Sequence, residues 1–207
     1  MLFLVILVAA IGYLLGNANG AVVVSKLLAK EDVRKKGSGN AGLTNYIRNY
    51  GAGSSVLVIL IDVAKAVLAC LIGGWILGTH GYGLEGRMLG GICVMLGHDF
   101  PVLLDFKGGK GILSGFAVAL TVDWRVGLAI FVVFAAVYLT TQYVSLGSVL
   151  AAATFGVAFC VFHFGNVWMM LGGVFLAVLT IWMHRGNIER LRKGEERKTN
   201  LFKGKDK

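Results

Sequence analysis

Apolar residues fill long stretches of the chain, and polar residues gather in short islands between them. A helix that crosses a hydrocarbon core about 30 Å thick needs roughly 20 apolar residues. The apolar stretches cover residues 2–25, 53–78, 84–97, 111–122, 125–141, 146–162 and 166–183. The third and fourth are short and could instead be re-entrant or core helices. The pattern predicts an all-α integral membrane protein with a seven-helix transmembrane bundle, and five spans as the alternative.

The composition supports a membrane protein and argues against a soluble one. Of the 207 residues, 57% are hydrophobic and 15% are charged, whereas soluble domains average about 25% charged residues. Nothing in the pattern separates one part of the chain from another. We therefore predict a single polytopic domain over residues 1–207.

The basic residues predict the orientation of the chain in the membrane. Of the 20 Lys and Arg residues, 17 lie in residues 26–48, 107–110 and 185–207. Basic clusters would suggest nucleic acid in a soluble protein, but here they lie between apolar spans and follow the positive-inside rule. Seven crossings place every cluster on one side. We expect the N-terminus outside, the C-terminus in the cytoplasm, and no nucleic-acid partner.

Two charged residues, Asp62 and Lys65, fall inside the second predicted span. Their spacing of three residues puts them on one helical face. Charges within a span are costly and usually face the bundle or a water-filled site. A structural ion pair and a functional role are both open for these residues.

The first polar island is "KKGSGNAGLTNYIR", residues 35–48. It combines glycines, which allow positive φ and close backbone approach, with hydroxyl, amide and cationic side chains. Successive backbone N–H groups in such a turn can bind an anion. The alternative is an ordinary flexible loop. The candidate binding residues are Gly37, Ser38, Asn40, Thr44, Asn45 and Arg48.

The second island is "GHDFPVLLDFKGGKG", residues 97–111. It is not a nucleotide P-loop, which would need glycine at Leu104 and Ser or Thr at Gly111. We expect a phosphate site that does not hydrolyse nucleotides. A basic loop that only sets orientation is the alternative. The candidate residues are His98, Lys107, Gly108, Gly109 and Lys110.

The third island, "HRGNIERLRKGEERK" at residues 184–198, follows the last span. His184 and Asn187 are three residues apart and can share a helical face. The positive-inside rule accounts for the tail after Arg197 but for neither of these two residues. The chain has no H-E-x-x-H motif and no Cys/His set, so we predict no metal site built by the protein.

Taken together, the three islands resemble the motifs of the bacterial acyl-phosphate:glycerol-3-phosphate acyltransferases, the PlsY family. The matching segments are "GSGNAGLTN" at 37–45, "GHDFPVLLDFKGGKG" at 97–111 and "HRGNIERLRKGEE" at 184–196. A further segment, "YVSLGS" at 143–148, resembles a serine-bearing segment of the family. Ala41 stands where the family often has proline, and Gly147 stands where a second serine is common.

The resemblance implies transfer of a fatty acyl group from acyl phosphate to the sn-1 hydroxyl of glycerol 3-phosphate. The products would be lysophosphatidic acid and inorganic phosphate, in the first step of phospholipid synthesis. It also implies a multi-pass protein of the bacterial inner (plasma) membrane, with the active site facing the cytoplasm. We expect no cofactor, and a monomer surrounded by membrane lipid.

The resemblance also suggests roles for individual residues. The residues expected to be catalytic are Ser38, Arg48, Lys107, His184 and Asn187. Those expected to bind substrate are Gly37, Asn40, Thr44, Asn45, His98, Gly108, Gly109, Lys110, Ser145, Ser148 and Glu196.

The proton acceptor is open at this level. The H-x-x-x-x-D dyad of another acyltransferase family is absent, because Leu103 follows His98 at that spacing and Glu189 follows His184. Either His184 acts alone or a substrate phosphate, with a second pKa near about 6, accepts the proton. We favour assistance by the substrate.

Two other functions fit part of the pattern. A small multi-pass transporter of an anionic solute would share the charges within spans and the basic loops. Such transporters often contain internal repeats with interrupted helices, but we find no repeat and the polar islands gather on one side. A lipid-binding scaffold would bind both substrates and form no product.

Overall fold

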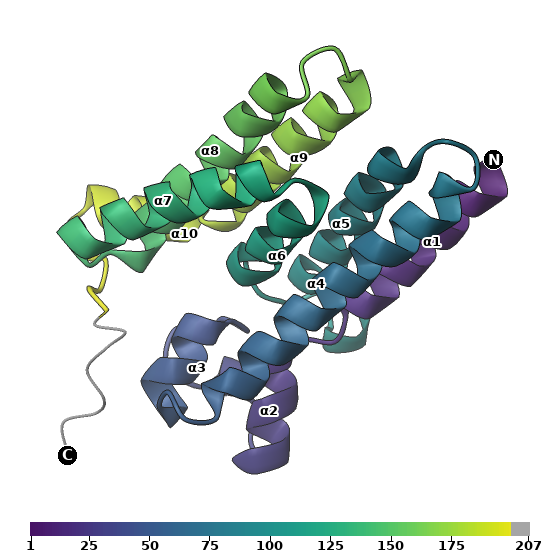
Figure 1. Cartoon of the computed structure of the whole chain (residues 1–207). Helices are drawn as coiled ribbons and strands as arrows, with labels where there is room; N and C mark the ends of the chain where they lie inside the picture. The colour runs from purple at the N-terminus through teal and green to yellow at the C-terminus, as the bar shows by residue number, and fades with distance from the viewer. Residues whose placement is uncertain (200–207) are drawn as a thin grey trace. The chain divides into compact units, whose positions relative to one another are not determined.

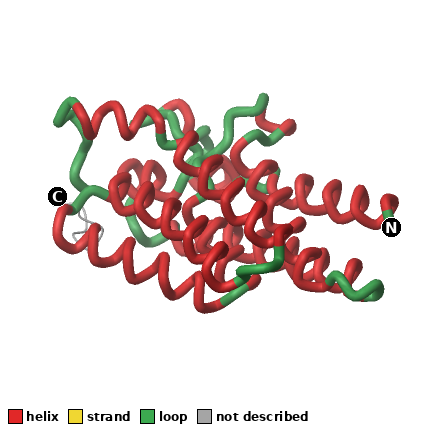
Figure 2. Tube along the Cα trace, turned by 90° about the horizontal axis from the view of Figure 1, so that it is seen from above, coloured by secondary structure: helices red, strands yellow, loops and turns green. Residues whose placement is uncertain are grey.

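Helices make up all the regular structure in residues 1–199, the part of the chain described by this computed structural model (Figure 2). They are α1 (Leu2–Gly16), α2 (Gly20–Leu28), η1 (Val33–Lys35), α3 (Leu43–Tyr50), α4 (Ser55–Gly78), α5 (Gly83–Asp99), η2 (Val102–Leu104), α6 (Ile112–Val122), α7 (Trp124–Thr141), α8 (Val144–Phe162), α9 (Val167–Met183) and α10 (Arg185–Arg192). The prediction of an all-helical membrane protein is confirmed.

The chain divides into two units, one of Met1–Val122 and one that begins at Asp123. In the first unit α4 and α5 pack together, α1 packs against both, and α6 lies against the same pair (Figure 1). Helices α2 and α3 lie beside the end of α4 where that helix begins. In the second unit short loops join α7, α8 and α9, and α10 contacts α8 and α9.

Within residues 1–199, five helical segments are long and apolar enough to cross a membrane, and a sixth is added if α9 and α10 form one span bent by 57°. The segment Leu2–Leu28 counts as one of the five. Helix α6 has 11 residues, which gives a length of about 16 Å at 1.5 Å per residue. That is about half of a hydrocarbon core. The predicted number of seven spans therefore stays a prediction, as does the orientation of the termini.

The first predicted span is not one continuous helix. Helix α1 ends at Gly16, and Asn19 starts α2 by accepting a hydrogen bond from the backbone N–H of Val22 at 3.0 Å. Asparagine is a preferred residue at this capping position because its side chain satisfies a backbone N–H that has no partner in the helix. A span is found where residues 2–25 predicted one, but the apolar count did not reveal the break at this cap.

Two charged residues of α4 form hydrogen bonds with the backbone between α1 and α2. Lys65 Nζ lies 2.7 Å from Asp62 Oδ1 and donates to the carbonyl oxygen of Ala18 at 2.8 Å. Asp62 in turn accepts the backbone N–H of Gly20 at 3.1 Å. Both side chains are almost completely buried. A buried ion pair needs such additional hydrogen bonds to offset its desolvation, so the contacts favour the structural interpretation of the pair.

Glycines bring α5 close to its neighbours. A Cβ on Gly86 would lie 2.2 Å from the carbonyl oxygen of Gly73 on α4, and one on Gly97 would lie 2.1 Å from that of Tyr13 on α1. Small residues at such crossings let helix backbones approach each other in membranes. Helix α5 ends at Asp99, two residues before Pro101, the only proline in the chain. The second island therefore begins in the last turn of α5.

Candidate phosphate-binding site

Asn45 organises the first island from within. Its amide nitrogen donates to the carbonyl oxygens of Val33, Lys36 and Asn40 at 3.0–3.1 Å. Its Oδ1 accepts the backbone N–H of Ser38 at 3.0 Å, and the residue is 2% exposed. Because both ends of the amide are bonded to the loop, Asn45 holds the loop in place. That its side chain also binds substrate stays a prediction.

The glycines of the first island differ in backbone conformation. Gly37 and Gly39 have positive φ, of 59° and 71°. A Cβ at Gly37 would also lie 2.4 Å from Oδ1 of Asn45. Gly42 has an extended backbone with φ −139° and is the N-cap residue of α3. The two turns leave Ser38 exposed at the tip of the loop.

The second island folds back on the end of α5. The backbone N–H of Gly108 donates to the carbonyl oxygen of Asp99 at 3.3 Å, and that of Gly109 donates to His98 at 3.1 Å. A Cβ on Gly108 would lie 2.0 Å from the carbonyl oxygen of His98. That Gly108 and Gly109 bind substrate stays a prediction. The glycines are needed because the loop backbone touches the backbone of α5.

His98 lies under this loop. It is 4% exposed, and its Nδ1 is 2.7 Å from Nζ of Lys65. A Cβ at Gly109 would lie 2.1 Å from Nε2 of the same ring. The imidazole thus fills the space between the buried ion pair and the glycine loop. That His98 contacts substrate stays a prediction.

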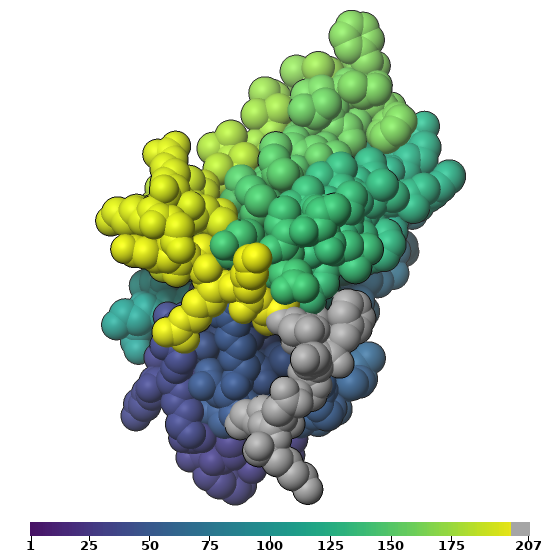
Figure 3. All heavy atoms as spheres, turned by 90° about the vertical axis from the view of Figure 1, so that its left-hand side faces the viewer, coloured from purple at the N-terminus to yellow at the C-terminus, as the bar shows by residue number. Residues whose placement is uncertain are grey.

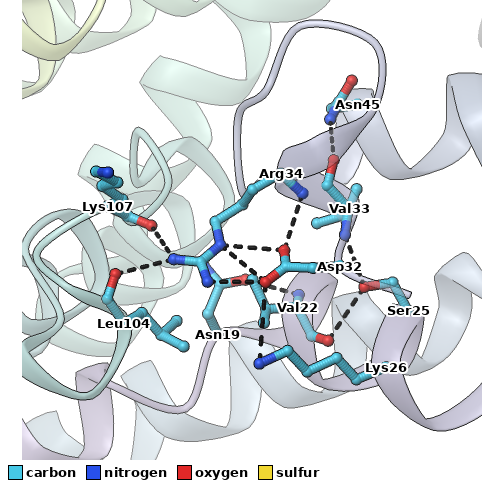
Figure 4. Close-up of polar contacts among 10 residues, drawn as sticks. All are labelled: Asn19, Val22, Ser25, Lys26, Asp32, Val33, Arg34, Asn45, Leu104 and Lys107. Atoms are coloured by element: carbon cyan, nitrogen blue, oxygen red, sulfur yellow. Dashed lines mark hydrogen bonds and ion pairs between the residues drawn. The ribbon is translucent and has the colours of Figure 1, made fainter. Parts of the chain in front are cut away.

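The first and second islands meet in the first unit. Ala41 O accepts a hydrogen bond from Asn19 Nδ2 at 2.9 Å and would lie 2.9 Å from a Cβ at Gly109. Arg34 Nη1 donates to the carbonyl oxygens of Leu104 and Lys107, at 2.9 and 3.3 Å (Figure 4). Neither Asn19 nor Arg34 was among the predicted site residues. Asn19 could have been found as a capping asparagine at the start of α2, and Arg34 as part of the Asp-x-Arg triplet before the first motif.

Several predicted residues of the first unit are placed where a ligand could reach them. The side chains of Ser38 and Lys107 are exposed, and neither has a hydrogen bond or ion pair with another residue in the described chain. Asn40, Thr44, Arg48 and Lys110 are partly exposed. These six residues come from two islands more than fifty positions apart in the sequence, and the contacts between the islands bring them to one part of the first unit.

The third island forms a separate cluster in the second unit. Glu196 accepts hydrogen bonds from Asn187 Nδ2 at 2.8 Å and from Arg190 Nε at 2.7 Å. Burial alone would raise the pKa of Glu196, but the hydrogen bonds from Asn187 and Arg190, together with the nearby Ser145 side chain, outweigh it and lower the pKa. In Figure 3, α10 and the residues after it (yellow) lie beside the green helices of the same unit. Ser145, Asn187 and Glu196 are therefore grouped, as three candidate site residues.

Two further candidates of the second unit have defined partners. His184 Nδ1 lies 2.8 Å from the carbonyl oxygen of Thr180. A carbonyl can only accept, so Nδ1 carries the proton and Nε2 is the acceptor of the neutral ring. Ser148 is 2% exposed and its hydroxyl donates to Val144 O at 2.8 Å within its own helix. That Ser148 binds substrate stays a prediction.

Comparison with known proteins gives a consistent result over nearly the whole chain. The family model described as glycerol-3-phosphate acyltransferase matches residues 6–194. A glycerol-3-phosphate acyltransferase of Thermoanaerobacter pseudethanolicus is 40% identical over 193 residues, which are 93% of this chain and 94% of the relative. One from Finegoldia magna is 39% identical over 202 residues, with 95% and 96% covered.

Two solved structures are similar as well. The crystal structure of PlsY (YgiH), an integral membrane glycerol 3-phosphate acyltransferase, in its glycerol 3-phosphate form has a TM-score of 0.83 and 33% sequence identity, and 98% of each chain is covered. The lysophosphatidic acid form has a TM-score of 0.81 and 31% identity, with 95% of this chain and 96% of that one covered. With these matches and the three motifs, the chain belongs to the glycerol-3-phosphate acyltransferase family.

Proposed function

We propose that the chain transfers a fatty acyl group from acyl phosphate to the sn-1 hydroxyl of glycerol 3-phosphate. The hydroxyl oxygen forms a bond to the acyl carbon, and the bond from that carbon to the phosphate oxygen breaks. The hydroxyl proton leaves with inorganic phosphate, and lysophosphatidic acid is the other product. The observation that carries the proposal is the contact between the first and second islands in a chain of this family.

The first unit supplies charge and hydrogen bonds to two phosphates that repel each other. Lys107, Lys110 and Arg48 contribute positive charge, and all three side chains are at least partly exposed. Hydrogen bonds between cations and phosphate oxygens are stronger than neutral ones. Hydroxyl and amide groups of the first island supply directed hydrogen bonds, namely those of Ser38, Asn40 and Thr44. Gly37, Asn45, Gly108 and Gly109 act by holding these groups in place.

Acyl phosphate carries its own leaving group, which reduces what the protein must do. The site has to hold the glycerol hydroxyl near the acyl carbon, stabilise the oxyanion and neutralise the departing phosphate. The proton goes to a substrate phosphate, whose second pKa lies near about 6. His184 is the alternative acceptor, through Nε2. No cofactor takes part in this scheme.

Residues of the second unit also take part in the reaction in this proposal. His184, Asn187 and Ser145 act on the substrates, and Glu196 holds Asn187 in position through its hydrogen bond. The reaction takes place at the cytoplasmic face of the bacterial inner membrane. The protein acts as a monomer.

We also propose seven crossings, with the N-terminus outside and the C-terminus in the cytoplasm. All three basic clusters then lie on the cytoplasmic side, as the positive-inside rule requires. Helix α6 crosses as a short helix, and a local thinning of the bilayer accommodates such a mismatch at modest cost.

The activity can be tested with the purified full-length chain in detergent, where transport is impossible. Phosphate release from palmitoyl phosphate should require glycerol 3-phosphate and should be matched by formation of lysophosphatidic acid. Lys110→Ala should abolish turnover and keep the helical circular dichroism of the wild type. Comparable transfer from acyl-CoA or acyl carrier protein would refute the donor, and wild-type turnover by Lys110→Ala would refute the phosphate clamp.

A further inference from the structure

Arg34 lies outside the matched motif at residues 37–45, yet it is the side chain that joins the first island to the second. Its Nε donates to both carboxylate oxygens of Asp32, at 3.0 and 3.2 Å, and its Nη2 donates to Oδ2 at 2.7 Å. The remaining nitrogen, Nη1, donates to the carbonyl oxygens of Leu104 and Lys107. All three nitrogens are therefore used within the protein, so Arg34 is not placed to bind a substrate phosphate.

The backbone next to Arg34 is fixed by burial and hydrogen bonds. The preceding residue, Val33, is completely buried. Its N–H donates to the hydroxyl of Ser25 at 3.1 Å, and its carbonyl accepts from Asn45 at 3.1 Å (Figure 4). The guanidinium therefore extends from a backbone that is bonded on both sides. Because this backbone is fixed, the planar guanidinium of Arg34 can define the position of the loop that it binds.

The segment that Arg34 binds is conformationally strained. Asp105 and Phe106, between the two carbonyls, have φ of 55° and 57°. Residues other than glycine adopt this left-handed conformation at a cost, so surrounding contacts must hold it. Arg34 Nη1 donates to the carbonyl oxygens of Leu104 and Lys107, which lie on either side of the strained pair, and these hydrogen bonds hold the conformation. In Figure 4 the Lys107 carbonyl oxygen faces the guanidinium and its side chain extends away.

We propose that Arg34 is a positioning residue that clamps the loop of residues 104–109 and so places Lys107 for the phosphate of a substrate. This inference rests on the proposed function for the identity of the ligand, and on geometry alone for the clamp. Asp32 orients the guanidinium, and the two loop carbonyls receive it. Lysine cannot replace it, because one ammonium cannot form the planar fork to the carboxylate and reach both carbonyls.

The chain contains a matched control. Arg125 forms the same fork with Asp123, in which Nε donates at 3.0 and 3.2 Å and Nη2 donates at 2.6 Å. Among the described residues, its hydrogen bonds go only to Asp123, and its guanidinium stacks on the ring of Phe162 at 4.8 Å. Arg125→Lys thus removes an arginine–aspartate fork that has no hydrogen bond to a distant loop.

The test compares Arg34→Lys and Arg125→Lys in the full chain in detergent. Hydrogen–deuterium exchange of the Gly108 and Gly109 amides should be about 10-fold faster in Arg34→Lys, because the loop opens more often. It should match the wild type in Arg125→Lys. Unchanged protection of α4 and α5 verifies the fold, and Arg34→Gln is measured as a second variant in case Arg34→Lys does not fold.

Transfer kinetics provide the second measurement. In Arg34→Lys, kcat/KM should fall about 10- to 100-fold, the range expected for lost hydrogen bonds to a charged group. Most of the loss should appear as a higher KM for acyl phosphate or for glycerol 3-phosphate. Arg125→Lys should stay within about threefold of the wild type.

Equal exchange of the two glycine amides in Arg34→Lys and in the wild type would overturn the clamp. An equal loss of kcat/KM in the two lysine variants would also overturn it. A wild-type chain that forms no lysophosphatidic acid would refute the proposed function instead. The exchange measurement needs no substrate, so the two failures are distinguishable.

Discussion

The chain uses the same local motif, Asp-x-Arg, in two places with different results. Asp32 and Asp123 each start a helix by accepting the backbone N–H of the arginine two residues on, at 2.9 Å in both cases. Each arginine then binds its own aspartate in a fork. Among the described residues, only the guanidinium of Arg34 goes on to donate hydrogen bonds to another segment, seventy residues away in the sequence. A local motif thus becomes part of a site only where the fold places a second partner opposite it.

The comparison extends to the surroundings of the two forks. Beside Arg34 lie loops with inward-facing amides and glycines that touch other backbones. Beside Arg125 lies the turn before α9, where Gly165 has open space around it. The first region should therefore be sensitive to changes that add an atom or remove a donor, and the second should tolerate them.

The largest effect is expected at Gly109. In Gly109→Ala, the added Cβ would overlap Nε2 of His98 and press on the carbonyl oxygen of Ala41. The loop must move, so turnover should fall at least about 100-fold, as misplacement of about 1 Å can cause. Gly165→Ala, whose φ of 92° carries strain but whose Cβ meets nothing, should lose stability and keep its kcat/KM. Steady-state transfer assays on both variants check this, and equal activity would contradict the contrast.

The next effect concerns the same substitution at two asparagines. Asn45→Asp removes the N–H groups that bond three carbonyl oxygens in a buried position, and should cost about 1–3 kcal/mol of stability together with most of the activity. Asn166→Asp keeps the oxygen that accepts Met169 N–H at the start of α9, and aspartate is an equally good cap. Denaturant titrations should show a large loss only for Asn45→Asp. A stable Asn45→Asp would show that the loop does not depend on this amide.

A smaller effect is expected for the two aspartates. Asp32→Asn weakens the fork that orients Arg34, so kcat/KM should fall by about 10-fold, near the lower end of the range for a hydrogen bond to a charged group. Asp123→Asn should change it by less than about threefold, because Arg125 binds no loop. Measurements of kcat and KM separately check the claim, and a larger loss in Asp123→Asn would reverse the assignment of roles.

The smallest effect is in the pH dependence of stability, which should be alike for both forks. Hydrogen bonds from Arg34 lower the pKa of Asp32, and those from Arg125 lower the pKa of Asp123. A lowered pKa in the folded state stabilises the protein above the ordinary carboxyl pKa of about 3.9, and this stabilisation is lost as pH falls through the lowered value. Thermal unfolding of the wild type and the two Asp→Asn variants between pH 3 and 7 should show differences that shrink with acid. A difference that grows with acid would contradict the assigned charges.

Much of the class of the protein could be predicted from the sequence, because the energy of burying apolar residues in a bilayer depends on local composition. The helices, the three polar islands and the family resemblance are all local patterns. Their bounds were less accurate where a polar cap interrupts an apolar run, as Asn19 does between α1 and α2. The number of spans was also open, since α6 is too short for its composition to decide whether it crosses.

The sequence by itself determined which residue types gather in each island, and with them the family. Only the tertiary structure decided which way the groups face. Asn45, the amides of Gly108 and Gly109, and the ring of His98 are directed into the protein, while Ser38 and Lys107 are exposed. It also decided that Arg34 reaches a loop seventy residues away. The physical reason is that a hydrogen bond depends on the distance and direction between two groups in space, which a one-dimensional pattern does not contain.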